Sequence, residues 1–393
     1  MNWPLASLSS IGSVNTGSTP KTNVAEYWDG DIPFITPSEL GSGEPITSAD
    51  RRLTRKGAAV GRIIPTEAVL VCCIGSLGKT GIAGTPVVAN QQINWIDFDK
   101  TKVWPRYGYY ACERLGRTLE SSSASTTIPI VNKSRFSALM IPLPPLREQQ
   151  RIAAILDKSD VLRRKRKRAV ELLDNLTQSI FFELFGHTSD DISNWGDPIP
   201  LSDLAEIGSG ITKGRKLNGQ STRPVPYLAV ANVQDRRLEL TNVKTIHATE
   251  SEISRHRLRK DDLLLTEGGD PDKLGRGTLW ADELSEAIHQ NHIFRVRINS
   301  NAVLPLFLNW LVASPYGKRY FLGVAKQTTG IASINKTQLS EFPTIVPPID
   351  LQRRFARMAQ SIGAETERVI SSLTETQLLF ASLQQRAFDG EFR

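Results

Sequence analysis

Two long stretches of the chain place apolar residues at helical spacing. The first begins after Pro145 and repeats an apolar position every three or four residues, with polar interruptions at Ser159 and Arg166. The second begins after Pro348 and repeats the pattern less regularly. This spacing predicts two helices with heptad seams, formed by Ile152, Ile155, Leu162, Leu173, Leu176, Ile180, Phe355, Met358, Ile362 and Val369.

Each predicted helix is too long to bury its seam alone. A helix of about 38 residues is roughly 55 Å long, at 1.5 Å per residue. We therefore expect the two helices to pair as an antiparallel coiled coil, related by a pseudo-two-fold axis. Arg166 would weaken this seam unless an acid of the other helix, such as Glu365 or Glu367, lies opposite.

The segments before the helices have a different pattern. They mix short apolar runs, such as VLVCCI and HIFRVRI, with Gly, Pro, Ser and Asn punctuation, as small α+β globules do. We predict an α+β chain in which two related globular domains of mixed α and β structure alternate with the two long helices. The predicted boundaries are 1–145, 146–187, 188–345 and 346–393.

The chain repeats itself at a fixed distance in sequence. Asn132-Lys133, Pro144-Pro145 and Gln149 recur as Asn335-Lys336, Pro347-Pro348 and Gln352, each 203 positions later (335 − 132 = 203). Looser matches precede them in the same order, including LASLSSIG with LSDLAEIG and Asn90-Gln91-Gln92 with His289-Gln290-Asn291. The chain is therefore two related halves.

Composition and charge favour a protein with a polyanionic partner. The 393 residues carry 48 Lys and Arg against 41 Asp and Glu, a net charge of +7, which is compatible with nucleic acid without requiring it. The sequence predicts no secretory signal and no membrane helix. Its three cysteines lack C-x-x-C spacing, which fits a reducing cytoplasm and makes structural zinc improbable.

One loop resembles a phosphate-binding loop without completing its pattern. CIGSLGKT, residues 73–80, follows an apolar run and ends in Gly78-Lys79-Thr80, but Cys73 stands where the first glycine belongs. The matching loop of the second half, GGDPDKLGRG (268–277), keeps glycines and positive charge but has no G-K-[ST]. Three interpretations stay open: a DNA-contacting loop, an ordinary connecting loop, and a nucleotide site in an enzyme.

The two globule-to-helix junctions carry a family resemblance. IPLPPLREQQRIAAILD (141–157), its second copy around VPPIDLQRRF (346–355), and the alternation of globules and helices resemble the specificity subunit of a type I restriction-modification system. The resemblance implies that each globule is a target-recognition domain that reads one half of a bipartite, asymmetric site in double-stranded DNA. The helix pair would set the spacing and dock two methyltransferase subunits, which restriction-translocase subunits join. The subunit itself would have no catalytic residues and no cofactor.

Polar and basic loop residues are the candidate DNA contacts, because Arg and Lys pair with guanine and phosphate, and Asn and Gln pair with adenine. Hydroxyl runs before each junction are added as candidate phosphate contacts. The set comprises Lys21, Lys79, Thr80, Gln91, Gln92, Ser123, Thr126, Lys213, Arg215, Lys216, Lys273, Arg276, Gln290, Thr328 and Thr329. The seam residues form the second set, for the coiled coil or subunit docking. The basic run 163–168 is interpreted either as a solvated helix face or as a docking surface.

Motifs of catalysis are missing from the sequence. His289 and His292 have no third ligand spaced nearby, so no metal is predicted. The sequence also lacks the Asp-Pro-Pro-Tyr or Asn-Pro-Pro-Tyr motif of amino-methyltransferases and the spacing of a PD-(D/E)-x-K nuclease. These features favour a subunit that reads DNA and leaves the chemistry to its partners.

Overall fold

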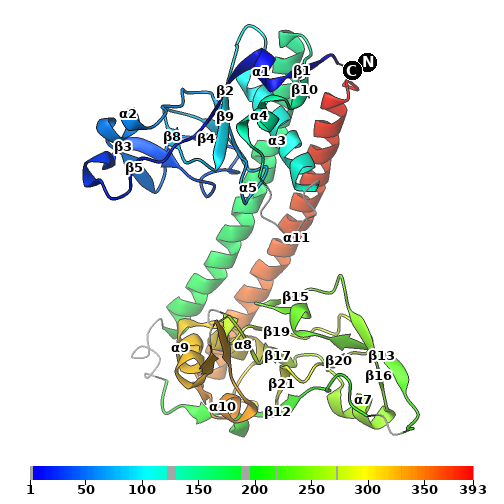
Figure 1. The fold of residues 1–393 in the computed structure, drawn as a ribbon. Coiled ribbons are helices and arrows are strands. Elements are labelled where there is room, and N and C mark those ends of the chain that lie inside the picture. The colour runs from blue at the N-terminus through cyan, green and yellow to red at the C-terminus, as the bar shows by residue number, and fades with distance from the viewer. Residues whose placement is uncertain are drawn as a thin grey trace. The chain divides into compact units, whose positions relative to one another are not determined.

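The chain divides into two compact units, each built from one globule and part of both long helices. The computed structural model describes residues 3–121, 130–186, 195–216, 219–270, 273–328 and 330–392. The first unit comprises residues 1–169 and 369–393, and the second comprises residues 170–368. Figure 1 labels the helices and strands.

In its described residues, the globule of the first unit is a five-stranded sheet, a three-stranded sheet and a two-stranded sheet with four α-helices. The larger sheets have the orders β2-β9-β6-β7-β4 and β5-β3-β8, and β1 pairs with β10. The elements are β1 (Leu5–Ser7), α1 (Leu8–Ile11), β2 (Gly12–Thr16), β3 (Trp28–Ile35), β4 (Pro45–Ile46), β5 (Arg51–Leu53), α2 (Arg55–Val60), β6 (Val69–Cys72), β7 (Thr80–Ala83), β8 (Val88–Ala89), β9 (Ile93–Phe98), α3 (Pro105–Ser121), α4 (Lys133–Ser137) and β10 (Met140–Pro142).

The globule of the second unit repeats this plan. Its sheets include β12-β21-β17-β19, β16-β13-β20 and β11-β24. The elements that form them and the adjoining helices are β11 (Ile199–Pro200), β12 (Ala205–Ser209), β13 (Arg223–Leu228), β16 (Lys244–Ala248), α7 (Glu250–His256), β17 (Leu263–Thr266), β19 (Gly277–Leu279), β20 (Ile288–His289), β21 (Ile293–Ile298), α8 (Pro305–Ala313), α9 (Pro315–Val324), α10 (Lys336–Ser340) and β24 (Pro343–Thr344).

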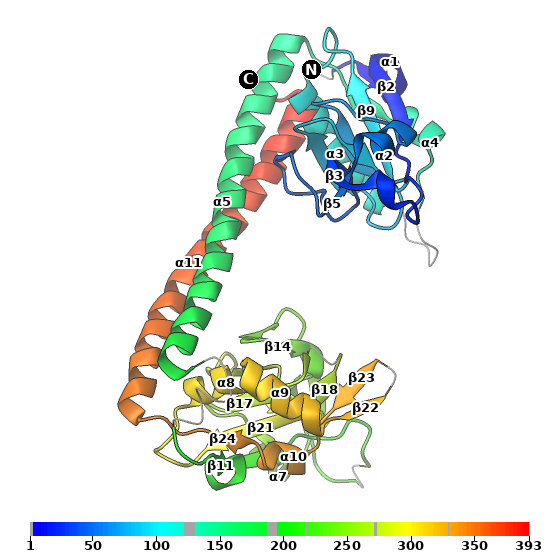
Figure 2. The ribbon, with the colours of Figure 1, turned by 90° about the vertical axis from the view of Figure 1, so that its left-hand side faces the viewer.

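Two smaller sheets complete the second globule. The hairpin of β14 (Val233–Gln234) and β15 (Arg237–Leu238) is a two-stranded sheet, and β18 (Gly268–Gly269) joins β22 (Lys326–Thr328) and β23 (Ile331–Ser333). Figure 2 shows α8 and α9 beside the sheet that contains β17 and β21.

The strand orders confirm the internal repeat. The four strands β2-β9-β6-β7 correspond to β12-β21-β17-β19, and β5-β3-β8 corresponds to β16-β13-β20. The pairing directions agree as well, since β3 is antiparallel to β5 and parallel to β8, as β13 is to β16 and β20. The predicted mixed α+β class is therefore correct for both halves.

The repeated junction residues have a structural reason. Gln149 is fully buried at the start of α5 (Leu146–Phe185), where its amide accepts from the Trp104 N–H (2.8 Å) and donates to the Lys102 and Pro144 carbonyls. Gln352 is likewise buried at the start of α11 (Ile349–Phe388). Its amide accepts from the Leu304 N–H and donates to the Ala302 and Pro347 carbonyls. Each glutamine thus joins a long helix to its own globule through backbone groups.

Segments of α5 and α11 lie side by side in each unit and run in opposite directions (Figures 1 and 2). In the first unit Ile152 and Leu156 of α5 share a core with Phe380 and Ala387 of α11. In the second unit the Phe181 ring of α5 lies 5.3 Å from the Phe355 ring of α11. The antiparallel pairing that the pseudo-two-fold relation requires is therefore present in both units.

The register of the predicted seam is partly wrong. Ile152 and Phe355 are buried, and Ile155, Leu173, Ile180, Met358, Ile362 and Val369 are half-buried. Leu162 and Leu176 are 42% and 47% exposed. Leu156, Arg163 and Thr177 occupy the inner positions instead, because the guanidinium of Arg163 stacks on the Phe380 ring at 4.6 Å and Thr177 is buried.

The condition set for Arg166, an acid such as Glu365 or Glu367 opposite it, is met by neutral groups instead. The Arg166 Nη1 donates to the Ser372 carbonyl at 2.7 Å and to the Thr376 hydroxyl. Glu365 instead pairs with Arg368 on its own helix. Neutral oxygens of α11 therefore satisfy the cation that interrupts the apolar seam, which hydrophobic periodicity alone does not predict. None of the helices in the described ranges is long and apolar enough to cross a membrane.

Candidate nucleic-acid interface

The glycine-rich loop of the first unit is a tight connection between β6 and β7. The Cys72 N–H donates to the Lys79 carbonyl at 2.8 Å, and the Gly78 N–H donates to the Cys72 carbonyl at 3.0 Å. Gly78 has φ +82°, and a Cβ atom there would lie 2.7 Å from the backbone of Gly116 on α3. Gly78 is therefore required by a close approach of two backbones.

This geometry does not favour the nucleotide interpretation. A phosphate loop directs several unpaired amides into one cradle, whereas here the Leu77 and Gly78 amides bond to the Gly75 and Cys72 carbonyls. The Thr80 hydroxyl also bonds internally, to the Gly78 carbonyl at 2.9 Å. The exposed side chains of the loop are those of Ser76 and Lys79, of which Lys79 carries the positive charge.

Changing Lys79 to alanine is expected to affect DNA binding without revealing a nucleotide site. If Lys79 neutralises a phosphate, the slope of log affinity against log salt falls by about 1. Titrations of DNA at several salt concentrations measure that slope, with Lys100→Ala, an exposed lysine paired with Glu67, as the control. ATP hydrolysis by the purified chain that Lys79→Ala abolishes would contradict this interpretation.

The corresponding loop of the second unit shows which of its residues is equivalent to Lys79. The Thr266 N–H donates to the Arg276 carbonyl at 3.0 Å, as the Cys72 N–H does to Lys79. Arg276 is therefore the equivalent of Lys79, and the alternative, Lys273, pairs with Asp270 inside the loop. The Arg276 guanidinium donates to the Gln234 side chain at 3.2 Å.

The glutamine loop of the first unit lies beside the glycine-rich loop. The Cys73 N–H donates to the Gln92 carbonyl at 2.8 Å, and the Thr19 hydroxyl donates to the Gln91 side chain at 2.5 Å. Lys21, which is exposed, follows Thr19, and its carbonyl accepts from the Trp28 indole at 3.2 Å. The structure thus gathers Lys21, Gln91, Gln92 and the Lys79 loop along one continuous part of the unit.

The same loops meet in the second unit, with a shift of one residue from the sequence match. The Asn90 N–H donates to the carbonyl of Ile35, the last residue of β3. The Gln290 N–H donates to the carbonyl of Leu228, the last residue of the equivalent strand β13. Gln290 therefore corresponds to Asn90 and not to Gln91. An isolated bridge joins Ile211 to Gln290 and brings the loop of residues 212–216 beside it.

The basic residues of that loop differ in their contacts. Lys213 and Lys216 are exposed. Arg215 binds both carboxylate oxygens of Glu252, at 2.5 and 2.6 Å, and these hydrogen bonds lower the pKa of Glu252 to about 2. Arg215 therefore fixes the loop to α7, and its contact with DNA stays a prediction, as it does for the other candidates.

Four of the predicted contacts have no described side chain. Ser123, Thr126 and Thr329 lie outside the described residues, and Thr328 is described only as part of the backbone of β22. Thr80 is buried. A DNA contact by the Thr80 side chain would need the loop to rearrange.

The two histidines are held separately. His289 is fully buried, its Nδ1 lies 2.9 Å from the Ile293 carbonyl, and burial lowers its pKa to about 3, so it is neutral near pH 7. His292 pairs with Glu267 at 2.5 Å. Within the described ranges, no three His, Cys, Asp or Glu side chains gather as metal ligands would.

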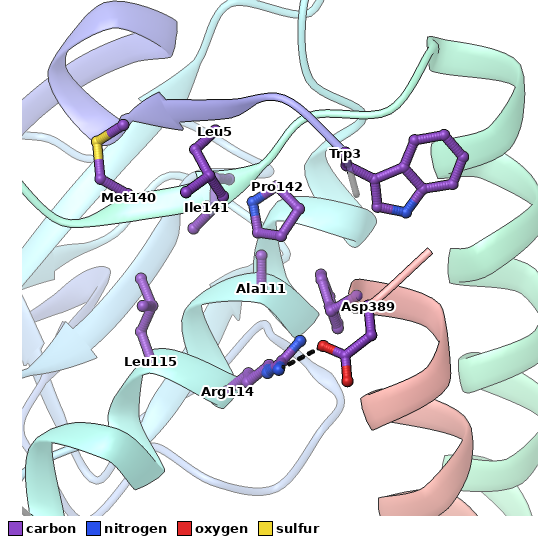
Figure 3. Close-up of a pocket in the computed structure, with 10 residues that line it drawn as sticks. Trp3, Leu5, Ala111, Arg114, Leu115, Met140, Ile141, Pro142 and Asp389 are labelled. Atoms are coloured by element: carbon purple, nitrogen blue, oxygen red, sulfur yellow. Dashed lines mark hydrogen bonds and ion pairs between the residues drawn. The ribbon is translucent and has the colours of Figure 1, made fainter. Parts of the chain in front are cut away.

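A pocket of about 390 Å³ lies where the start of the chain meets the end of α11 (Figure 3). Figure 3 shows Arg114 of α3 paired with Asp389, an ion pair of 2.9 Å, and Trp3 at the other side, whose indole donates to the Ala387 carbonyl. Exposed Leu5 and Met140 complete its rim. The predicted DNA contacts are not among its lining residues.

Residues 1–172 match a family model described as the type I restriction modification DNA specificity domain. The first part of the chain therefore matches the DNA specificity domain of this family, and the chain is similar to specificity subunits of type I restriction enzymes. The MjaIX specificity subunit of Methanocaldococcus jannaschii is 33% identical over 190 residues, which cover 47% of this chain and 44% of that protein. The EcoKI specificity subunit of Escherichia coli is 24% identical over 290 residues, 70% of this chain and 62% of that protein.

The fold of the specificity subunit extends over the whole chain. The crystal structure of the S subunit from M. genitalium superposes with a TM-score of 0.57 at 15% identity, covering 99% of this chain and 96% of that one. In sequence, by contrast, the chain spans only 44% to 62% of the length of the first curated relatives. The resemblance found at the junction motifs is confirmed.

Sequence reasoning missed two basic residues near the candidate contacts. Lys133 follows the Asn132 cap of α4, and its amine lies 3.4 Å from the Asn15 side chain on β2. The repeated Asn-Lys pair was a signal for it. Arg51 begins β5 and stacks on Trp28 at 3.8 Å. Arg51 and Trp28 are 23 residues apart in the sequence, so no local motif predicts their contact.

Proposed function

We propose that the chain is the noncatalytic DNA-reading subunit of a cytoplasmic type I restriction-modification complex. Each globule reads one half of a bipartite, asymmetric site in double-stranded DNA, and the helix pair sets the spacing between the halves. Two methyltransferase subunits dock on the helices, and restriction-translocase subunits join that core. The names of the relatives support this assignment, since they are specificity subunits of type I restriction enzymes.

The observation that carries the proposal is one framework with two different sets of loop side chains. Both globules repeat the same strand order. At equivalent loop positions, however, Gln92 is replaced by His292, because the Glu267 N–H donates to the His292 carbonyl as the Cys73 N–H does to that of Gln92. Because glutamine pairs with adenine, whereas His292 is paired with Glu267, the two halves of the site are expected to differ in sequence.

Genome-wide methylation mapping tests the proposal. The chain is co-expressed with its cognate methyltransferase subunit, and the methylated positions are read from the host DNA. A bipartite motif with two unlike halves and a constant spacer is expected. Methylation at a continuous or palindromic motif would contradict it, as would methylation that does not require this chain.

Exposed leucines on α11 support the docking of methyltransferase subunits. Leu378 and Leu379 are 68% and 53% exposed, in the same unit as the exposed Ile370 and Leu162. Because isolated apolar side chains are common on surfaces, it is the adjacency of two strongly exposed leucines on one helix that favours an interface.

Changing Leu378 and Leu379 together to aspartate is therefore expected to abolish co-purification with the methyltransferase subunit, since a charge would be buried at the interface. The melting temperature of the isolated chain should change little. Glu375→Gln, at another exposed position of the same helix, is the control. Retained co-purification of the double variant would place the docking surface elsewhere.

A further inference from the structure

Arg51 is held against aromatic rings at the surface of the first unit. Its guanidinium carbon lies 3.8 Å from the centre of the Trp28 ring and 5.6 Å from that of Phe34. Trp28 is itself fixed, because its indole donates to the Lys21 carbonyl and its ring meets the Phe34 ring edge-on at 5.2 Å. Phe34 is 1% exposed. The guanidinium plane therefore rests on a rigid aromatic base.

This contact occupies the face of the guanidinium and leaves its edge available. The five N–H donors of arginine lie in the plane of the group, so a stacked arginine directs them sideways. The side chain of Arg51 makes no hydrogen bond or ion pair among the residues that the structure describes, although its backbone is paired with Phe34 in the sheet. Arg106 and Arg164, in contrast, are paired with Asp157 and Asp160.

The neighbourhood of Arg51 is that of the candidate DNA contacts. Lys21, whose carbonyl holds Trp28, belongs to the segment in which Thr19 bonds to Gln91. Arg51 is exposed on the same part of the unit. A guanidinium that is already held in one orientation loses less conformational entropy on binding than a mobile side chain does.

We infer that Arg51 reads a guanine in the half-site of the first globule, donating its two parallel hydrogen bonds to O6 and N7 in the major groove. The inference rests on the proposed DNA-reading function and adds one base-specific residue to it. We place guanine ahead of phosphate because the Trp28 ring covers one face of the fork and leaves its planar edge to meet the flat edge of a base. A phosphate also matches this fork, so a phosphate contact is one outcome of the test.

Arg51→Lys tests the inference, because lysine keeps the charge and loses the planar fork. Each variant is co-expressed with the cognate methyltransferase subunit, and the methylated sites are mapped. One guanine position of one half-site is expected to become degenerate, with a preference reduced on the order of tenfold. The other half-site and the spacer stay unchanged. Arg52→Lys, the next residue along β5, is the matched control because no ring lies under it in the described structure.

A second measurement changes the base and not the protein. The wild-type complex is titrated with its mapped site carrying 7-deazaguanine at each guanine in turn, which removes the N7 acceptor. Binding is expected to weaken at the position that Arg51→Lys makes degenerate, and Arg51→Lys should remove the difference between guanine and 7-deazaguanine there.

Two results would overturn the inference while leaving the proposed function intact. The first is a half-site preference that Arg51→Lys does not alter. The second is an Arg51→Ala complex that binds all sequences more weakly and with a shallower salt dependence, which indicates a phosphate contact. If the wild-type complex methylates no sequence-specific sites, the proposed function itself fails.

Discussion

Replacing Gln149 with leucine is expected to lower the free energy of unfolding by about 3 kcal/mol. The buried amide satisfies the Trp104 N–H and the Lys102 and Pro144 carbonyls. Leucine fills a similar volume but leaves these three backbone groups without partners, at about 1 kcal/mol or more each. Urea unfolding of the full chain measures the loss.

The chain contains its own controls for this prediction. Gln150→Leu changes the next, exposed residue of the same helix and should alter stability by less than about 0.5 kcal/mol. Gln352→Leu removes the equivalent amide in the second unit and should cost about as much as Gln149→Leu. Equal stability of the Gln149 and Gln150 variants would mean that the repeated glutamine does not join helix to globule.

Replacing Phe355 with alanine should destabilise the second unit by about 3 to 5 kcal/mol. Phe355 of α11 is fully buried, and its ring lies 5.3 Å from Phe181 and 5.7 Å from Phe185, both on α5. It also meets Trp310 of α8 edge-on at 5.7 Å. One side chain therefore joins both long helices to the globule, and its removal leaves a cavity among rings that cannot close it.

Denaturant unfolding measures this cost, and hydrogen exchange of α8 and of both helix ends reports where it acts. Leu378→Ala, on the same helix but 68% exposed, should change stability by less than about 0.5 kcal/mol. A uniform loss of protection in both units would show that Phe355 supports the whole chain. Protection lost only around the aromatic cluster would match the expectation.

The sequence predicted the framework because its signals are local or repeated. Pro-Pro pairs before apolar periodicity mark the starts of α5 and α11, and the 203-residue offset anticipates the common strand order. The seam register was less predictable. Periodicity favours Leu162 because it is apolar, yet Arg163 occupies the inner position by stacking on Phe380, a residue more than 200 positions away.

The candidate site was harder to predict because its contacts join distant segments. Nothing near Gly78 in sequence indicates that a glycine is required there because the backbone of Gly116 approaches closely. Similarly, Arg215 is an exposed cation by composition, but Glu252, 37 residues later, binds its guanidinium. Basic loop residues can be found from sequence, whereas their division into structural ion pairs and available donors requires the fold.

The approach of Gly78 to Gly116 separates the loop into a fixed part and a variable part. Gly78 and the buried Leu77 cannot change without moving α3, since their space is already filled by backbone and core. Ser76 and Lys79 are exposed beside them and support neither contact. If this loop reads DNA as proposed, new preferences can evolve at these two positions at little cost in stability, because the same backbone crossing keeps presenting whatever side chains they carry.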